Sequence, residues 1–82
     1  MSNRKMPYTE KGIRRLKCFR CGKPARTQWE ICSDNNTYRP LCLRCDYELN
    51  KTVLEFMGFD DTEEKLQAYK QYLEEAYGEK VD

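Results

Sequence analysis

Two Cys-x-x-Cys pairs are the residues of this chain whose types and spacing could do chemistry. The first pair is Cys18 and Cys21, the second is Cys42 and Cys45, and twenty residues separate the pairs. Two cysteine pairs at this separation are typical of a tetrahedral zinc site. The pattern therefore predicts one Zn²⁺ per chain, held by these four cysteines.

Such a site is expected to be structural and not catalytic. Four cysteine ligands leave no open position for water or substrate, and the chain contains no histidine to act as a general base. We therefore predict that the protein is not an enzyme and has no small-molecule substrate. An iron or iron–sulfur centre and a pair of redox dithiols are weaker alternatives, since they favour other cysteine runs or a thioredoxin-like βαβ unit.

The fifth cysteine, Cys32, has no obvious partner in the sequence. Its neighbours Ile31 and Ser33 provide no positive charge that would activate the thiol. We expect Cys32 to be a small, partly buried apolar residue near a turn.

Length and composition favour a metal-stabilised domain in a reducing compartment. An 82-residue chain with 39% hydrophobic and 35% charged residues has a marginal core, which a bound metal would reinforce. The first seventeen residues contain no signal-peptide core, and no segment reaches transmembrane length. The expected location is the cytoplasm, with no membrane association and with the cysteines reduced, as metal ligands and not disulfides.

The segment between the cysteine pairs predicts a β-hairpin. Residues 25–32 alternate apolar and polar side chains, residues 33–37 are rich in turn formers, and residues 38–41 form a short second strand. The strand phase places Trp29 on the buried face. We expect this side chain to pack on the helix that follows Cys42.

Two helices are expected after the hairpin. The first shows apolar side chains at spacings of three and four and ends at Gly58; its predicted buried face consists of Cys45, Leu49, Val53, Phe56 and Met57. The second is expected to begin at Asp60 or Asp61 and to run to about Tyr77, before Gly78. The predicted fold is a small, zinc-stapled α+β domain, with a treble-clef-like knuckle, hairpin and helix followed by a C-terminal helix.

Three segments are expected along the chain. Residues 1–17 form a basic N-terminal arm without clear periodicity, which we expect to be flexible or loosely packed and which includes Arg4 and Lys5. Residues 18–58 form the four-cysteine zinc domain. Residues 59–82 form an acidic C-terminal helix packed on it.

Charge is divided unevenly between the halves of the chain. Residues 1–45 carry eleven Lys/Arg and three Asp/Glu, whereas residues 46–82 carry four Lys/Arg and eleven Asp/Glu. The acidic half favours a protein partner, and its candidate residues are Asp60, Asp61, Glu63, Glu64, Tyr69, Tyr72, Glu74 and Glu75. The basic half offers nucleic-acid binding as the alternative, through Arg14, Arg15, Lys17, Arg20, Lys23 and Arg26. The oligomeric state is left open between monomer and homodimer.

Several stretches form a recognisable set: CFRCGKPA at 18–25, QWEIC at 28–32, TYRPLC at 37–42, CDYELN at 45–50 and VLEFMG at 53–58. Together they resemble a family of short four-cysteine zinc proteins of bacteriophages and proteobacteria without an assigned function. The resemblance implies a phage-type accessory protein in the host cytoplasm, with Cys18, Cys21, Cys42 and Cys45 as ligands. Such a protein could act as an adaptor or inhibitor, in anti-defence or in transcription.

The cysteine spacing and the following helix are also similar to the zinc finger of bacterial DksA/TraR-type regulators. This chain lacks the long helical segment that precedes that finger and reaches into RNA polymerase. The similarity therefore covers the finger alone.

Overall fold

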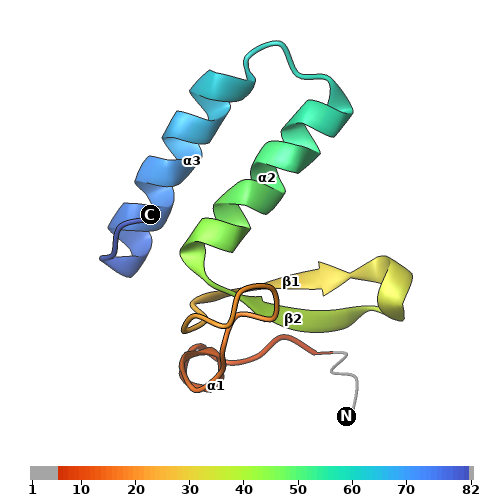
Figure 1. Ribbon diagram of the computed structural model, residues 1–82, viewed down its shortest axis with the longest axis vertical. Coiled ribbons are helices and arrows are strands. Elements are labelled where there is room, and N and C mark those ends of the chain that lie inside the picture. Colours follow the sequence, from red (N-terminus) through yellow and green to blue (C-terminus); the bar gives the residue numbers. More distant parts are fainter. Residues whose placement is uncertain (1–5, 82) are drawn as a thin grey trace. The chain divides into compact units, whose positions relative to one another are not determined.

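A computed structural model describes residues 6–81 of the chain (Figure 1). The predicted α+β class is confirmed: a two-stranded antiparallel hairpin is combined with two long helices. The contacts divide the chain into unit 1, Met1–Cys42, and unit 2, Leu43–Asp82. In chain order the elements are α1 (Glu10–Arg14), β1 (Thr27–Ile31), the 3-10 turn η1 (Cys32–Asp34), β2 (Thr37–Leu41), α2 (Leu43–Met57) and α3 (Thr62–Tyr77).

The hairpin of unit 1 is the one that the sequence predicts, because local turn chemistry determines it. The strands pair from Thr27 opposite Leu41 to Ile31 opposite Thr37. Asn35 and Asn36 adopt left-handed backbone with φ of 58° and 59°, a conformation that asparagine tolerates. The Thr37 hydroxyl donates a 2.8 Å hydrogen bond to an Asp34 carboxylate oxygen, which closes the turn.

The segment before the first cysteine pair, for which the sequence shows no clear periodicity, contains the short helix α1. The hydroxyl of Thr9 accepts a hydrogen bond from the Gly12 N–H and caps α1, whose Ile13 is only 3% exposed. The backbone of Tyr8 exchanges two hydrogen bonds with the Gln28 side chain, at 2.7 and 2.9 Å. These hydrogen bonds connect the residues before α1 to β1, a contact that the periodicity of residues 6–17 does not reveal. Arg4 and Lys5 lie outside the described residues.

Trp29 does not occupy the buried position that its strand phase predicts. Its side chain is 38% exposed, whereas Ala25 and Thr27 earlier in the same alternation are buried. Trp29 pairs across the hairpin with Arg39, a polar neighbour. The prediction fails because a two-stranded sheet does not bury the full length of one face.

Unit 2 is built from α2 and α3, which lie side by side in Figure 1 and are joined by a link at residues 58–61. Gly58 and Gly78 end the two helices with φ of 78° and 67°, as predicted for these glycines. The core consists of Leu43, Leu73 and Val81, with Tyr47, Tyr69 and Tyr77 packed against it.

The buried face of α2 differs from the predicted one. Cys45 is buried, but Val53, Phe56 and Met57 are 37%, 85% and 64% exposed. The buried residues of α2 are Leu43, Cys45 and Asp46. The spacing of Val53, Phe56 and Met57 does form an apolar stripe along α2. However, α3 packs against a different stripe of α2, which contains Leu43 and Tyr47.

A buried carboxylate connects the two helices of unit 2. Asp46 is only 5% exposed, and its Oδ1 accepts hydrogen bonds from the Tyr69 hydroxyl and, at 3.0 Å, from the Asn50 amide. Burial and this carboxylate, which disfavour a tyrosinate, raise the pKa of Tyr69 well above its ordinary 10.0. Tyr69 therefore remains protonated in the folded protein at pH values where it ionises in the unfolded chain.

Alkaline pH is expected to remove the stability that Tyr69 provides. With a raised pKa in the folded state, this stability is complete below pH 10.0 and declines as pH rises above it. At neutral pH Tyr69→Phe should reduce the free energy of unfolding by about 1–3 kcal/mol, because Asp46 loses a buried donor. In urea denaturation, the difference between wild type and Tyr69→Phe should narrow above pH 10. A constant difference would contradict this prediction, and Tyr72→Phe, at an exposed position, is the control.

Candidate metal centre

The four paired cysteines come together in space. The Sγ atoms of Cys18, Cys21, Cys42 and Cys45 all lie within 4.8 Å of one another, and together they could hold a metal ion. Cys18, Cys42 and Cys45 are buried, whereas Cys21 is exposed. Three of the four thiols are buried side by side. Because the described residues include few other buried apolar side chains, these cysteines are a large part of the buried interior.

The first cysteine pair lies in a tight loop. The Gly22 N–H donates to the Cys18 carbonyl oxygen at 2.9 Å, and Gly22 has the positive φ, 83°, predicted for it. The Phe19 N–H donates to the Pro40 carbonyl oxygen at 2.8 Å. Since Pro40 lies two residues before Cys42 in β2, this bond anchors the loop beside the second pair.

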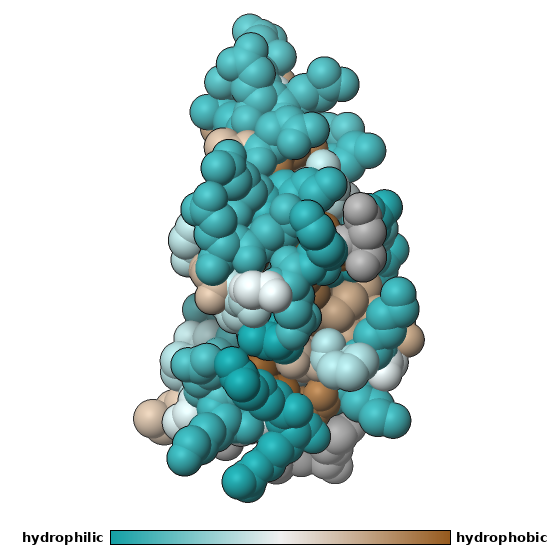
Figure 2. All heavy atoms as spheres, turned by 90° about the vertical axis from the view of Figure 1, so that its left-hand side faces the viewer, coloured by the Kyte–Doolittle hydropathy of each residue, from teal (hydrophilic) through white to brown (hydrophobic). Residues whose placement is uncertain are grey.

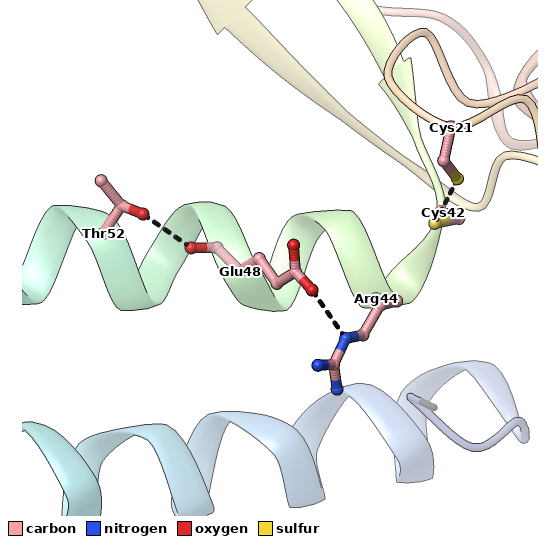
Figure 3. A network of polar contacts seen from close by, with 5 residues as sticks. All are labelled: Cys21, Cys42, Arg44, Glu48 and Thr52. Carbon is pink, nitrogen blue, oxygen red and sulfur yellow. Dashed lines mark hydrogen bonds and ion pairs between the residues drawn. The ribbon is translucent and has the colours of Figure 1, made fainter.

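The second pair lies at the transition from strand to helix, as predicted. Cys42 follows the last residue of β2, and Cys45 belongs to the first turn of α2. Helix N-termini present unpaired N–H groups and a partial positive charge, which favour thiolate sulfur. Figure 3 shows Cys42 at this transition with Cys21 beside it, and Arg44 paired with Glu48 at 2.8 Å one turn into the helix.

The sulfur positions fit a bound metal better than a disulfide. The Sγ atoms of Cys21 and Cys42 are 3.5 Å apart, whereas a disulfide bond is about 2.05 Å long, and none of the five cysteines is in a disulfide. A tetrahedral site with metal–sulfur bonds of about 2.3 Å requires sulfur atoms about 3.8 Å apart. The observed separations bracket that value, so the donor set and its geometry are suited to one tetrahedral metal ion.

Cys32 is not part of this group. It begins η1 at the end of the hairpin and is exposed, so the prediction of a partly buried apolar residue is wrong. The difference arises because the turn region of a two-stranded hairpin has little protein to pack against.

The predicted nucleic-acid residues all belong to unit 1. Arg14 lies in α1, where it pairs with Glu10 at 3.1 Å, and the others are on the loops that surround the first cysteine pair. Arg26 is half-buried; the exposed members are Arg14, Arg15, Lys17, Arg20 and Lys23. The structure thus places these cations on one small unit, whose sequence, residues 1–42, carries ten Lys/Arg and three Asp/Glu.

The predicted partner-binding residues form two groups on or just before α3. Asp60, Asp61, Glu63 and Glu64 lie at its beginning; the second group is Tyr69, at the middle of the helix, with Tyr72, Glu74 and Glu75 in its second half. In the second group, Tyr69 bonds Asp46, and the Glu74 carboxylate accepts a 3.1 Å hydrogen bond from the Val81 N–H. These two side chains are therefore engaged within unit 2. Tyr72 stacks on Tyr69 with ring centroids 6.1 Å apart but remains 60% exposed.

Sequence reasoning missed a cluster of exposed apolar residues at the end of α2. Val53, Phe56 and Met57 were assigned to a buried face, and Phe59, which follows the helix, is also 47% exposed. A repeating apolar pattern shows that a stripe exists. It does not show whether another element covers the stripe, so the sequence alone offered no means of finding this cluster.

No family model, curated protein or solved structure matches this chain. The resemblance to short four-cysteine phage proteins therefore stays a prediction. Across residues 6–81, none of the helices combines the length and the apolar character needed to cross a membrane.

Proposed function

We propose that Cys18, Cys21, Cys42 and Cys45 bind one structural Zn²⁺ in a treble-clef arrangement. The order of elements supports this: a cysteine loop, the β1–β2 hairpin and then α2, with the second cysteine pair at the helix start. Four thiolates favour zinc among the common cellular cations, and the resulting site is closed. The zinc would hold the fold and perform no catalysis, since no coordination position is open and the chain has no histidine.

The function we propose is stoichiometric binding of another protein. The observation that carries it is the exposure of large apolar side chains in unit 2, above all Phe56 at 85% and Met57 at 64%. Aromatic residues and methionine are enriched in protein interfaces, and clustered exposure is costly unless a partner covers it. An accessory protein of this kind would act in the cytoplasm as an adaptor or inhibitor of a host or phage protein.

Nucleic-acid binding through unit 1 is the second candidate. Its support is the basic excess of residues 1–42 together with exposed Phe19 and Trp29, aromatic rings that could stack on bases. Two features weaken it. Arg14 is paired with Glu10, and residues 43–82 carry five Lys/Arg against eleven Asp/Glu, a charge that opposes a polyanion.

A pull-down from the native cells tests the proposal. The full-length, zinc-loaded protein is the bait, the bound material is treated with nuclease before elution, and the proteins recovered with the bait are identified. We expect one protein to be recovered in a near-stoichiometric ratio, independently of nuclease. In parallel mobility-shift titrations, DNA and RNA should bind no more tightly than about 1 μM at physiological salt, the tight end of non-specific binding. Submicromolar, strongly salt-dependent binding of nucleic acid without a stoichiometric protein would contradict the proposal.

A further inference from the structure

Cys21 differs from the other three cysteines of the metal centre in its access to solvent. The other three are buried, whereas Cys21 is exposed. It lies in the loop at residues 19–24, all of which are exposed, between Arg20 and Lys23 in the chain. Cysteines that react with oxidants are typically solvent-accessible and lie in an electropositive environment. Cys21 is therefore the member of the group that a small oxidant in solution reaches first.

The Sγ atom of Cys42 lies close to that of Cys21. The two sulfur atoms are 3.5 Å apart, and both residues belong to unit 1. Figure 3 shows the two side chains pointing toward each other. A disulfide bond of about 2.05 Å requires the sulfur atoms to approach by about 1.5 Å. Because the loop that carries Cys21 is exposed, we expect this loop to make the movement.

The fifth cysteine is too far away to compete as a disulfide partner. Cys32 follows β1 at the turn end of the hairpin, where Thr37 begins β2, and Cys42 follows Leu41 at the other end of β2. Four steps of about 3.3 Å separate Thr37 from Leu41, so the two ends of the hairpin lie about 13 Å apart. A disulfide needs Cα atoms within about 7 Å. Cys32 therefore does not reach Cys42 or the Cys21 sulfur beside it.

We propose that Cys21 is an oxidation site of the metal centre, where hydrogen peroxide drives formation of a disulfide with Cys42. The Cys21 thiolate sulfur attacks one peroxide oxygen, the O–O bond breaks, and hydroxide leaves. The Cys42 thiolate attacks the sulfur of the resulting sulfenic acid, the S–O bond breaks, and a second hydroxide leaves as the S–S bond forms. Two electrons pass from the two sulfur atoms to the peroxide, and two solvent protons convert the hydroxides to water.

The disulfide would release the metal. It removes two of the four thiolate ligands, and the two that remain, Cys18 and Cys45, do not complete a tetrahedral site. Residues 6–42 have little apolar interior to compensate, and hydrophilic side chains predominate over unit 1 in the lower part of Figure 2. Because thiols reduce such a disulfide, the change would be reversible. The inference rests on the proposed zinc centre and identifies the ligand through which that centre responds to oxidant.

Zinc release from the full-length, zinc-loaded protein tests the inference. Hydrogen peroxide is added in the presence of a chromogenic zinc chelator, and the release rate is corrected for a sample without peroxide. We expect Cys21→His to release zinc at least about tenfold more slowly than wild type, because histidine also ligates zinc but forms no disulfide. Cys32→Ser is the matched control: it removes an exposed thiol outside the metal centre and should release zinc at the wild-type rate.

Disulfide mapping in wild type gives a second readout, which does not depend on the folding of a variant. After peroxide treatment the free thiols are alkylated, and the digested protein is analysed by mass spectrometry. In the protein that has lost zinc we expect Cys21 linked to Cys42, and Cys18 and Cys45 alkylated. Reduction with dithiothreitol should restore zinc binding.

Three results would overturn the inference while the proposed zinc centre stands. The first is a different disulfide pairing in the protein that has lost zinc. The second is equal release rates for wild type and a zinc-loaded Cys21→His variant. The third is retention of zinc at peroxide concentrations that fully oxidise Cys32. A protein that contains no zinc as purified would contradict the zinc centre itself, and the inference with it.

Discussion

Replacing Cys42 with serine is expected to abolish metal binding and to leave residues 6–42 without a stable fold. Within residues 6–42, the buried apolar residues besides the cysteines are few: Ile13, Ala25, Pro40 and Leu41. A structural zinc contributes about 10–16 kcal/mol of apparent binding free energy to small domains of this kind, and a serine hydroxyl does not replace a thiolate ligand. A loss of this size is comparable with the whole stability of a typical small domain, about 5–15 kcal/mol.

Metal content and the dispersion of amide resonances measure this effect. Cys32→Ser is the matched control, because Cys32 is an exposed thiol outside the four-cysteine group. We expect Cys32→Ser to retain the metal and the wild-type spectrum, and Cys42→Ser to lose both. A Cys42→Ser variant with wild-type metal content and a dispersed spectrum would show that this group does not stabilise the fold.

Leu73→Ala should strongly destabilise unit 2. Leu73 is 2% exposed and packs with Leu43 and Val81. Truncation of a buried leucine costs about 2–5 kcal/mol, because transfer free energy is lost and a cavity remains. The measurement is urea denaturation followed by far-UV circular dichroism at saturating zinc.

Tyr72→Ala provides the comparison for this core substitution. Tyr72 is the immediate neighbour of Leu73 in α3 but is 60% exposed, so its truncation should cost less than about 1 kcal/mol. Equal effects of the two substitutions would mean that α3 does not pack through Leu73.

The sequence predicted those features of the fold that local chemistry determines. The asparagine-rich turn, the second cysteine pair at a helix start and the glycines at the helix ends each depend on a few adjacent residues. The position of Gly58 predicted the end of α2 correctly, and Gly78 that of α3. The cysteine spacing predicted the four-sulfur group for the same reason: each pair is a local motif, and the hairpin between the pairs is short.

Features that depend on long-range packing could not be predicted. The order of the segment around α1 comes from hydrogen bonds between Tyr8 and Gln28, twenty residues apart. The exposure of Trp29, Phe56 and Met57 depends on which element covers which face. The apolar pattern of α2 is the same whether its stripe is covered or exposed, so only the structure shows that the stripe is exposed.

The central claim is that four thiolates hold one structural zinc ion, and zinc analysis of the purified, full-length protein tests it most directly. Native mass spectrometry should give one Zn²⁺ per chain, and X-ray absorption should give four sulfur neighbours at about 2.3 Å. Removal of the metal with a chelator should collapse the dispersed amide spectrum of residues 6–42, and added zinc should restore it. A protein that contains no zinc as purified and retains its spectrum in excess chelator would contradict the account.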